Sequence, residues 1–137
     1  MSENGTATGD TVTFFDRTYD EALQLARDAR DYIAAKGQGE RAGMSPDLRL
    51  AASCEEMRIT ARITQVMAWM LVQRAVHAGE MTRAEAAEEP NRLSGQSACL
   101  GEPVVPEAEL PPRLSSLLQR SRSLYERVQR LDATLDG

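Results

Sequence analysis

The sequence has 137 residues, of which 42% are hydrophobic and 27% are charged, as is typical of one soluble domain with a single modest core. Aromatic residues make up only 4%, which disfavours a strand-rich sandwich or barrel and favours helices. The formal net charge of −5 argues against a protein whose main task is to bind nucleic acid, because affinity for phosphate backbones comes from clustered Lys and Arg.

Cysteine usage and hydropathy predict a cytoplasmic protein. The two cysteines cannot form a disulfide framework, and neither belongs to a CxxC pair. The longest apolar run covers residues 66–72, far fewer than the roughly 20 residues that a membrane span requires. The first residues lack the basic stretch and apolar run of a secretory signal, so we expect neither a leader nor a membrane anchor.

The first segment, residues 1–13, is polar and predicts a disordered tail, which leaves residues 14–137 as a single helical domain. Apolar side chains then recur at steps of three and four residues from Thr18 to about Lys36, and this spacing predicts an amphipathic helix. The helix is expected to end at Gly37 and Gly39, because glycine adopts the left-handed conformation that terminates helices.

A second helix is predicted from Ser45, a good capping residue, to about His77. Pro46 fits its first turn, and the segment would span roughly 50 Å at 1.5 Å per residue. Two apolar stripes run along nearly opposite sides, one with Leu48, Ala52, Ile59, Ile63, Val66 and Met70, the other with Leu50, Cys54, Met57, Ala61, Ala68, Val72 and Ala75. A helix that is apolar on two sides must be covered on both, by helices of the same chain or by a second chain.

The rest of the chain predicts one short and one long helix. Thr82 and Glu85 form a capping box that opens a short segment closed by Pro90. Residues 94–112 are rich in Gly and Pro, so we expect a long loop without regular structure. Leucines at nearly heptad spacing after Pro112 predict the last helix. The predicted fold is all-α: an antiparallel three-helix bundle with a long central helix, a short extra helix and a long loop before the last helix.

The sequence contains no familiar catalytic motif, and we predict no catalytic residue, metal or cofactor. His77 is the only histidine, and it is expected simply to end the second helix. Glu55 and Glu56 are adjacent on that helix and so point about 100° apart. Cys54 lies on an apolar stripe, and Cys99 lies in the expected loop without an activating neighbour. A small enzyme or ligand sensor that uses Glu55, Glu56 and Cys54 remains an alternative.

The central helix gives a stronger signal, which points to assembly. Trp69 is interpreted as a core residue rather than an anchor. Arg58 and Arg62 lie between the apolar stripes, so each either pairs with a group such as Glu55 or marks an interaction surface, and both interpretations stay open. The candidates for a dimer interface or core are Met57, Ile63, Val66, Trp69 and Met70. The candidates for partner binding are Arg58, Arg62, Gln73, Arg74, Arg113 and Arg120.

The first two predicted helices carry a longer pattern. The central helix contains EMRITARI at residues 56–63 and QVMAWMLVQRAV at residues 65–76, and GEM follows at residues 79–81. The first helix contributes Phe14, Phe15, Thr18, Tyr19, Glu21, Ala22, Leu25, Ala26, Ala29, Arg30 and Tyr32. In these residues the chain resembles the RcdA family, the regulators of CtrA degradation. The resemblance covers residues 14–81 and joins polar and apolar positions in one register.

This resemblance implies a three-helix bundle without catalytic activity, commonly dimeric and found in alphaproteobacteria. Family members act as proteolytic adaptors that deliver cell-cycle regulators to the ClpX–ClpP protease, together with a primer called CpdR and, for the regulator CtrA, the effector PopA. The adaptor needs neither ATP nor metal, and recruitment to the cell pole is expected. Family members use a flexible C-terminal tail in delivery, whereas the sequence reaches Gly137 soon after Leu135, so we expect scaffolding rather than tail-mediated tethering.

From this resemblance we expect the polar face around Arg58, Arg62 and Gln73, and the start of the last helix, to contact partners. Charge reversal at Arg62 is then expected to weaken such a contact and to leave helicity intact. A structural homodimerisation module is the first alternative, followed by the small enzyme or ligand sensor. DNA binding through the basic last helix is the third, although we expect no nucleic-acid partner.

Overall fold

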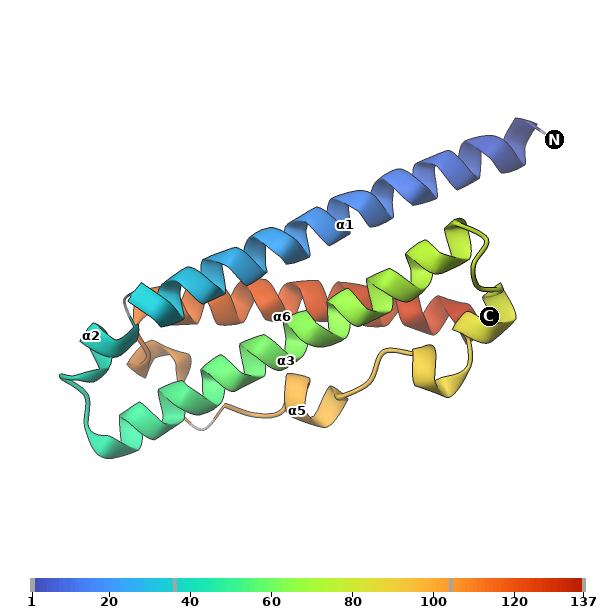
Figure 1. Ribbon diagram of the computed structural model, residues 1–137. Coiled ribbons are helices and arrows are strands. Elements are labelled where there is room, and N and C mark those ends of the chain that lie inside the picture. The colour runs from blue at the N-terminus through green and yellow to red at the C-terminus, as the bar shows by residue number, and fades with distance from the viewer. Residues whose placement is uncertain (1, 36, 104, 137) are drawn as a thin grey trace.

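Three long helices pack side by side in this computed structural model, which describes residues 2–35, 37–103 and 105–136 (Figure 1). They are α1 (Ser2–Ala35), α3 (Pro46–His77) and α6 (Pro112–Ala133). No strand occurs in these described residues, so the predicted all-α bundle with a long central helix is confirmed. α1 runs antiparallel to both other helices, whereas α3 and α6 run parallel, because the segment between them returns along the bundle (Figure 1).

α1 begins earlier than expected. Its helical backbone starts at Ser2 and includes residues 2–13, for which the composition predicts a disordered tail. This end of α1 extends past the other two long helices (Figure 1). An existing helix gains one backbone hydrogen bond for each added residue, which favours its extension. Met1 and Lys36, the expected ends of the tail and of the first helix, lie outside the described residues, and the single domain over residues 14–137 stays a prediction.

α1 ends at Ala35, directly before the two glycines expected to terminate it, but the left-handed conformation expected of Gly37 and Gly39 is wrong. Helix α2 (Gly37–Arg41) includes both glycines, and positive φ angles among the described residues occur only at Gly79 and Gly95. The Tyr32 hydroxyl donates a 2.5 Å hydrogen bond to Oε2 of Glu40, which joins this short helix to α1. These side-chain contacts hold the segment in a helix that glycine alone does not favour.

The ends of α3 follow the predicted capping signals. Ser45 has an extended backbone, and its hydroxyl accepts a 3.2 Å hydrogen bond from the backbone N–H of Leu48. Pro46 occupies the first turn, where its missing N–H removes no helical bond. The helix ends at His77, and Gly79 with φ of +78° turns the chain away. These local signals confirm both predicted boundaries of the central helix.

The segment between α3 and α6 contains more regular structure than predicted. It holds α4 (Arg83–Ala86), opened by the predicted capping box, and η1 (Glu89–Asn91), α5 (Gln96–Leu100) and η2 (Glu107–Glu109). Residues 94–112 are therefore not wholly irregular, which corrects the sequence expectation. α5 buries Cys99 completely within the core. A last turn, η3 (Thr134–Asp136), follows α6.

Candidate functional site

The Arg62 side chain is a structural anchor inside the bundle. It is only 4% exposed, its Nε donates to the Cys99 carbonyl at 2.7 Å, and its Nη1 donates to the Leu118 carbonyl and to Ser121 Oγ, both at 2.9 Å. Burial, followed by the charges of nearby guanidinium groups, lowers the pKa of Arg62 below its usual value. The sequence leaves open whether Arg62 is paired within the fold or marks an interaction surface. The geometry supports pairing within the fold.

Arg58 has a similar role one turn earlier on α3. Its Nε lies 3.2 Å from Oε2 of the buried Glu55, as the sequence suggested. Its Nη2 donates to the Glu102 carbonyl at 3.1 Å, and its Nη1 donates to the Gly101 carbonyl. Charge-assisted bonds of this kind hold the segment after α5 against α3. Arg58 and Arg62 therefore act as two clamps on the connection between α3 and α6.

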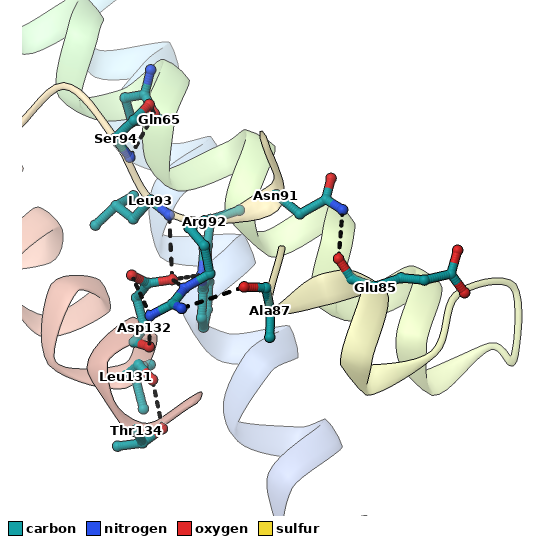
Figure 2. Close-up of polar contacts among 11 residues, drawn as sticks. Gln65, Glu85, Ala87, Asn91, Arg92, Leu93, Ser94, Leu131, Asp132 and Thr134 are labelled. Atoms are coloured by element: carbon teal, nitrogen blue, oxygen red, sulfur yellow. Dashed lines mark hydrogen bonds and ion pairs between the residues drawn. The ribbon is translucent and has the colours of Figure 1, made fainter. Parts of the chain in front are cut away.

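Asp132 near the end of α6 forms a third junction, which Figure 2 shows together with Arg92. Its Oδ1 accepts from Arg92 Nε at 2.9 Å, from Trp69 Nε1 at 2.8 Å and from the Leu93 backbone N–H at 3.2 Å. Beside it, Gln65 Oε1 accepts from the Ser94 hydroxyl at 2.8 Å (Figure 2). The junction satisfies a buried carboxylate and fixes Trp69 in the core, as predicted for that residue.

The remaining partner-binding candidates divide into one buried amide and three exposed cations. Gln73 is buried and lies near the end of α3. The guanidinium of Arg74 lies 4.7 Å from the centroid of the Tyr19 ring, and Arg120 forms a 2.8 Å ion pair with Asp28. Arg113 lies 5.6 Å from the centroid of the Tyr32 ring. These three cations line the contacts of α1 with α3 and α6, and their surfaces stay open to solvent.

The dimer or core candidates also divide. Ile63, Val66, Trp69 and Met70 are buried in the core, whereas Met57 is 72% exposed. Leu50 and Leu71, at 67% and 54% exposed, lie seven residues before Met57 and fourteen after it on the same helix. Small residues repeat beside them at seven-residue spacing. We call this set the outer seam of α3; it consists of Leu50, Cys54, Met57, Ala61, Ala68, Leu71 and Ala75.

The residues with catalytic potential do not form a reactive cluster in the described part of the chain. Glu55 pairs with Arg58, and Glu56 pairs with Arg41 of α2. Burial raises the pKa of the Cys99 thiol, which disfavours a reactive thiolate. No group of three or more potential metal ligands lies among the described residues. None of the helices within these residues has the length and hydropathy of a membrane span.

Comparison with known proteins identifies the family. Residues 8–137 match the family described as "Protein of unknown function (DUF1465)". The crystal structure of RcdA from Caulobacter crescentus CB15 is 38% identical to the chain, covers 88% of it and 89% of its own length, and superposes with a TM-score of 0.70. The chain belongs to the RcdA family. No curated protein matches it.

Family membership confirms the resemblance seen in the first two helices and extends it over nearly the whole chain. Sequence reasoning found the RcdA-family pattern but missed the junction at Asp132, because its partners lie about 40 residues or more away in the chain. It also placed Leu50 on an apolar stripe without recognising that Leu71 continues the same line. The seven-residue spacing from Leu50 through Met57 to Leu71 is the signal that identifies the outer seam.

Proposed function

We propose that the chain is a non-enzymatic proteolytic adaptor that helps to deliver cell-cycle regulators to the ClpX–ClpP protease. The observation that carries this proposal is the 38% identity to RcdA across 88% of the chain. The partners proposed from the family resemblance are ClpX–ClpP, a CpdR-like primer, a PopA-like effector and cargo regulators such as CtrA. The proposed place of action is the cytoplasm, with recruitment to the cell pole.

The physical basis of delivery is a rise in the local concentration of cargo. Two modest contacts joined through one rigid body bind more tightly than either contact alone, by about 100-fold or more. The clamps at Arg58 and Arg62 and the junction at Asp132 fix the connection between α3 and α6. Partner surfaces on different helices therefore keep a constant separation, which supports a scaffolding role.

Exposed cations of α3 and α6 support a partner surface beside α1. Arg74, Arg113 and Arg120 are exposed, and two of them already lie against aromatic rings. Guanidinium groups at such positions recognise carboxylates and stack on planar groups. Arg62 is buried, so a partner reaches it only if the bundle rearranges, and Gln73 is buried away from the outer surface. The proposed partner surface accordingly shifts from Arg62 to these three exposed arginines.

The outer seam of α3 supports assembly as a homodimer. Its large members, Leu50, Met57 and Leu71, lie at multiples of seven residues with the exposed Thr64 between the last two, and small residues such as Ala61 and Ala68 repeat beside them. Such a pattern lets a second helix approach closely and interlock its side chains. A two-fold dimer uses the same patch on both subunits, and one continuous seam on one helix meets this requirement. The second apolar side of the central helix would then be covered by a second copy.

The decisive experiment measures degradation of purified CtrA by ClpX–ClpP, with a CpdR-like primer and a PopA-like effector present, and with or without this chain. We expect the initial rate to rise when the chain is added and to saturate with its concentration. An Arg113→Glu, Arg120→Glu double variant should reduce the gain, while an Arg27→Glu, Arg49→Glu double variant at exposed positions of α1 and α3 serves as the charge-matched control. An unchanged rate with every tested cell-cycle cargo would contradict the adaptor proposal.

A structural homodimerisation module is the second candidate, and the outer seam is the observation that favours it. Such a module would form dimers in solution but would leave the degradation rate unchanged. The degradation assay therefore distinguishes the two candidates, whereas sedimentation is expected to show a dimer for both.

A further inference from the structure

A cavity of about 340 Å³ opens at the end of the bundle where α3 leads into α4. Its volume falls within the range of about 300–1,000 Å³ that is usual for ligand pockets. The described residues that line it are mostly apolar, with a few polar groups among them. They are Phe15, Gln73, Val76, His77, Arg83, Ala86, Ala87, Thr134 and Leu135, and they come from α1, α3, the α4 region and η3.

Gln73 is the buried polar group of this cavity. Its side chain is 6% exposed, and its Nε2 is fully buried without a hydrogen-bond partner among the described residues. A buried amide donor without an acceptor destabilises a folded protein, so native proteins rarely keep one. Because Gln73 lines the cavity, a small shift of its side chain would bring this donor to a ligand that supplies an acceptor there.

The rim of the cavity carries one guanidinium and one imidazole. His77 and Arg83 are both exposed, and neither forms an ion pair in the part of the chain that the structure describes. The described lining contains no carboxylate. The Phe15 ring lies 5.3 Å from the His77 ring and 5.9 Å from the Trp69 ring, measured between centroids, and forms an aromatic wall. Charge complementarity therefore favours a ligand with an apolar body and a negative end.

We propose that this cavity binds the C-terminal end of a polypeptide, with a small apolar last side chain against Phe15 and the terminal carboxylate near His77 and Arg83. The carboxamide of Gln73 both donates and accepts hydrogen bonds, so it complements a peptide group. A fatty acid offers the carboxylate but no N–H for the carbonyl oxygen of that amide. The inference rests on the proposed adaptor function, because it gives the adaptor a site for cargo.

The first test is peptide binding without protease. The probe is a fluorescein-labelled octapeptide pool with random first positions and Ala, Val or Leu at the last two, made with either a free C-terminal carboxylate or a C-terminal amide. Fluorescence anisotropy should show about tenfold tighter binding of the carboxylate pool, because charge-assisted hydrogen bonds to an anion are lost in the amide. Equal affinity of the two pools, or no binding of either, would overturn the proposal.

Variants of the chain locate the site. Arg83→Glu should weaken binding of the carboxylate pool about tenfold, and Arg83→Lys should retain most of it. Arg27→Glu, on an exposed position of α1 outside the cavity, is the charge-matched control and should bind like the wild type. In a nuclear magnetic resonance titration, the side-chain NH₂ signals of Gln73 should shift on peptide addition. Stationary Gln73 signals, or equal loss of binding in the control, would place the peptide elsewhere.

These outcomes are separate from the test of the proposed function. If the peptide binds and degradation is not accelerated, the cavity remains a peptide site and the adaptor proposal fails. If degradation is accelerated and no peptide binds, the chain contacts its cargo through another surface. Decanoic acid, added as a competitor, should not displace the peptide, because it supplies a carboxylate but no peptide group for Gln73.

Discussion

Arg62 joins α3 to α5 and α6 through hydrogen bonds to the Cys99 carbonyl, the Leu118 carbonyl and the Ser121 hydroxyl. A buried cation loses its hydrating water. Around the Arg62 guanidinium, three fixed hydrogen-bond acceptors replace that water. The same arrangement changes the meaning of charge reversal at this position. Arg62→Glu would place a carboxylate against two carbonyl oxygens, so the expectation that helicity stays intact does not hold, and this variant cannot test partner binding.

Arg62→Met should therefore lower the free energy of unfolding by about 3 kcal/mol, since methionine fills the space of the aliphatic stem but leaves buried carbonyl groups without their donor. Urea unfolding followed by circular dichroism measures this change. Arg27→Met, at an exposed position on α1, should shift the free energy by less than about 0.5 kcal/mol. If both variants unfold at the same urea concentration, Arg62 does not anchor the bundle.

Acidic side chains of α1 form ion pairs with arginines of α6. Glu21 pairs with Arg127 through two hydrogen bonds of 2.8 Å, and Asp28 pairs with Arg120 at 2.8 Å. The hydrogen bond from Arg127, aided by its charge, lowers the pKa of Glu21 below its usual value. Both side chains are partly exposed, so each pair contributes modestly and mainly fixes the register of α1 on α6.

Glu21→Gln should destabilise the bundle at pH 7 by about 0.5 kcal/mol, the range for exposed ion pairs. Because folding lowers the pKa of Glu21, its stabilisation is fully present above the unfolded pKa of about 4.5 and disappears as the pH falls through the folded value. The difference between wild type and variant should therefore shrink in thermal unfolding as the pH falls below about 4.5. Asp20→Asn, one residue earlier and exposed, is the control. A difference that stays constant as the pH falls would contradict this role of the ion pair.

The helices that the sequence predicts correctly are those with local signals. Ser45 and Pro46 start α3, and Thr82 with Glu85 starts α4, because a cap forms between residues three apart in the chain. The end of α1 is close to the predicted position, but Gly37 and Gly39 lie in a short helix because the contacts of Tyr32 and Arg41 with glutamates outweigh the preference of glycine. α5 was missed for a similar reason, since Arg62 stabilises it from 37 residues away.

The candidate site was less predictable than the fold. Position on the helix surface correctly placed Arg58 and Arg62 one turn apart on one side of α3, but the spacing of residues on α3 does not reveal which flank α5 covers. Only the structure therefore shows that Arg62 is buried and clamps the connection, whereas Arg74 is exposed. Met57 is predicted to lie in the core or in a dimer interface, and only the structure shows that it is exposed and outside the single-chain core.

The whole molecule has one continuous core, to which α1, α3, α5 and α6 all contribute. The inner stripe of α3 is buried in that core, while the large members of its outer seam, Leu50, Met57 and Leu71, stay exposed. Two properties are proposed for this protein, a rigid body and a surface for a second copy. The buried side of α3 accounts for the first, and its exposed apolar side accounts for the second. The two properties are coupled, because dimerisation would stabilise the folded state by mass action.

This coupling predicts that the unfolding midpoint of the wild type rises with protein concentration. For a dimer that unfolds to monomers, each tenfold increase in concentration adds about 1.4 kcal/mol per mole of dimer. Met57→Glu places a charge in the middle of the outer seam and should remove this dependence, because a buried unpaired carboxylate opposes association.

Sedimentation should show the Met57→Glu variant as a monomer with unchanged helicity, because Met57 contributes little to the single-chain core. Ser123→Glu, at an exposed position of α6 away from the seam, is the matched control and should behave like the wild type. A concentration-independent midpoint in the wild type, or a dimer that survives Met57→Glu, would remove the outer seam as the interface. The exposed apolar side of α3 would then have to be covered by a different partner.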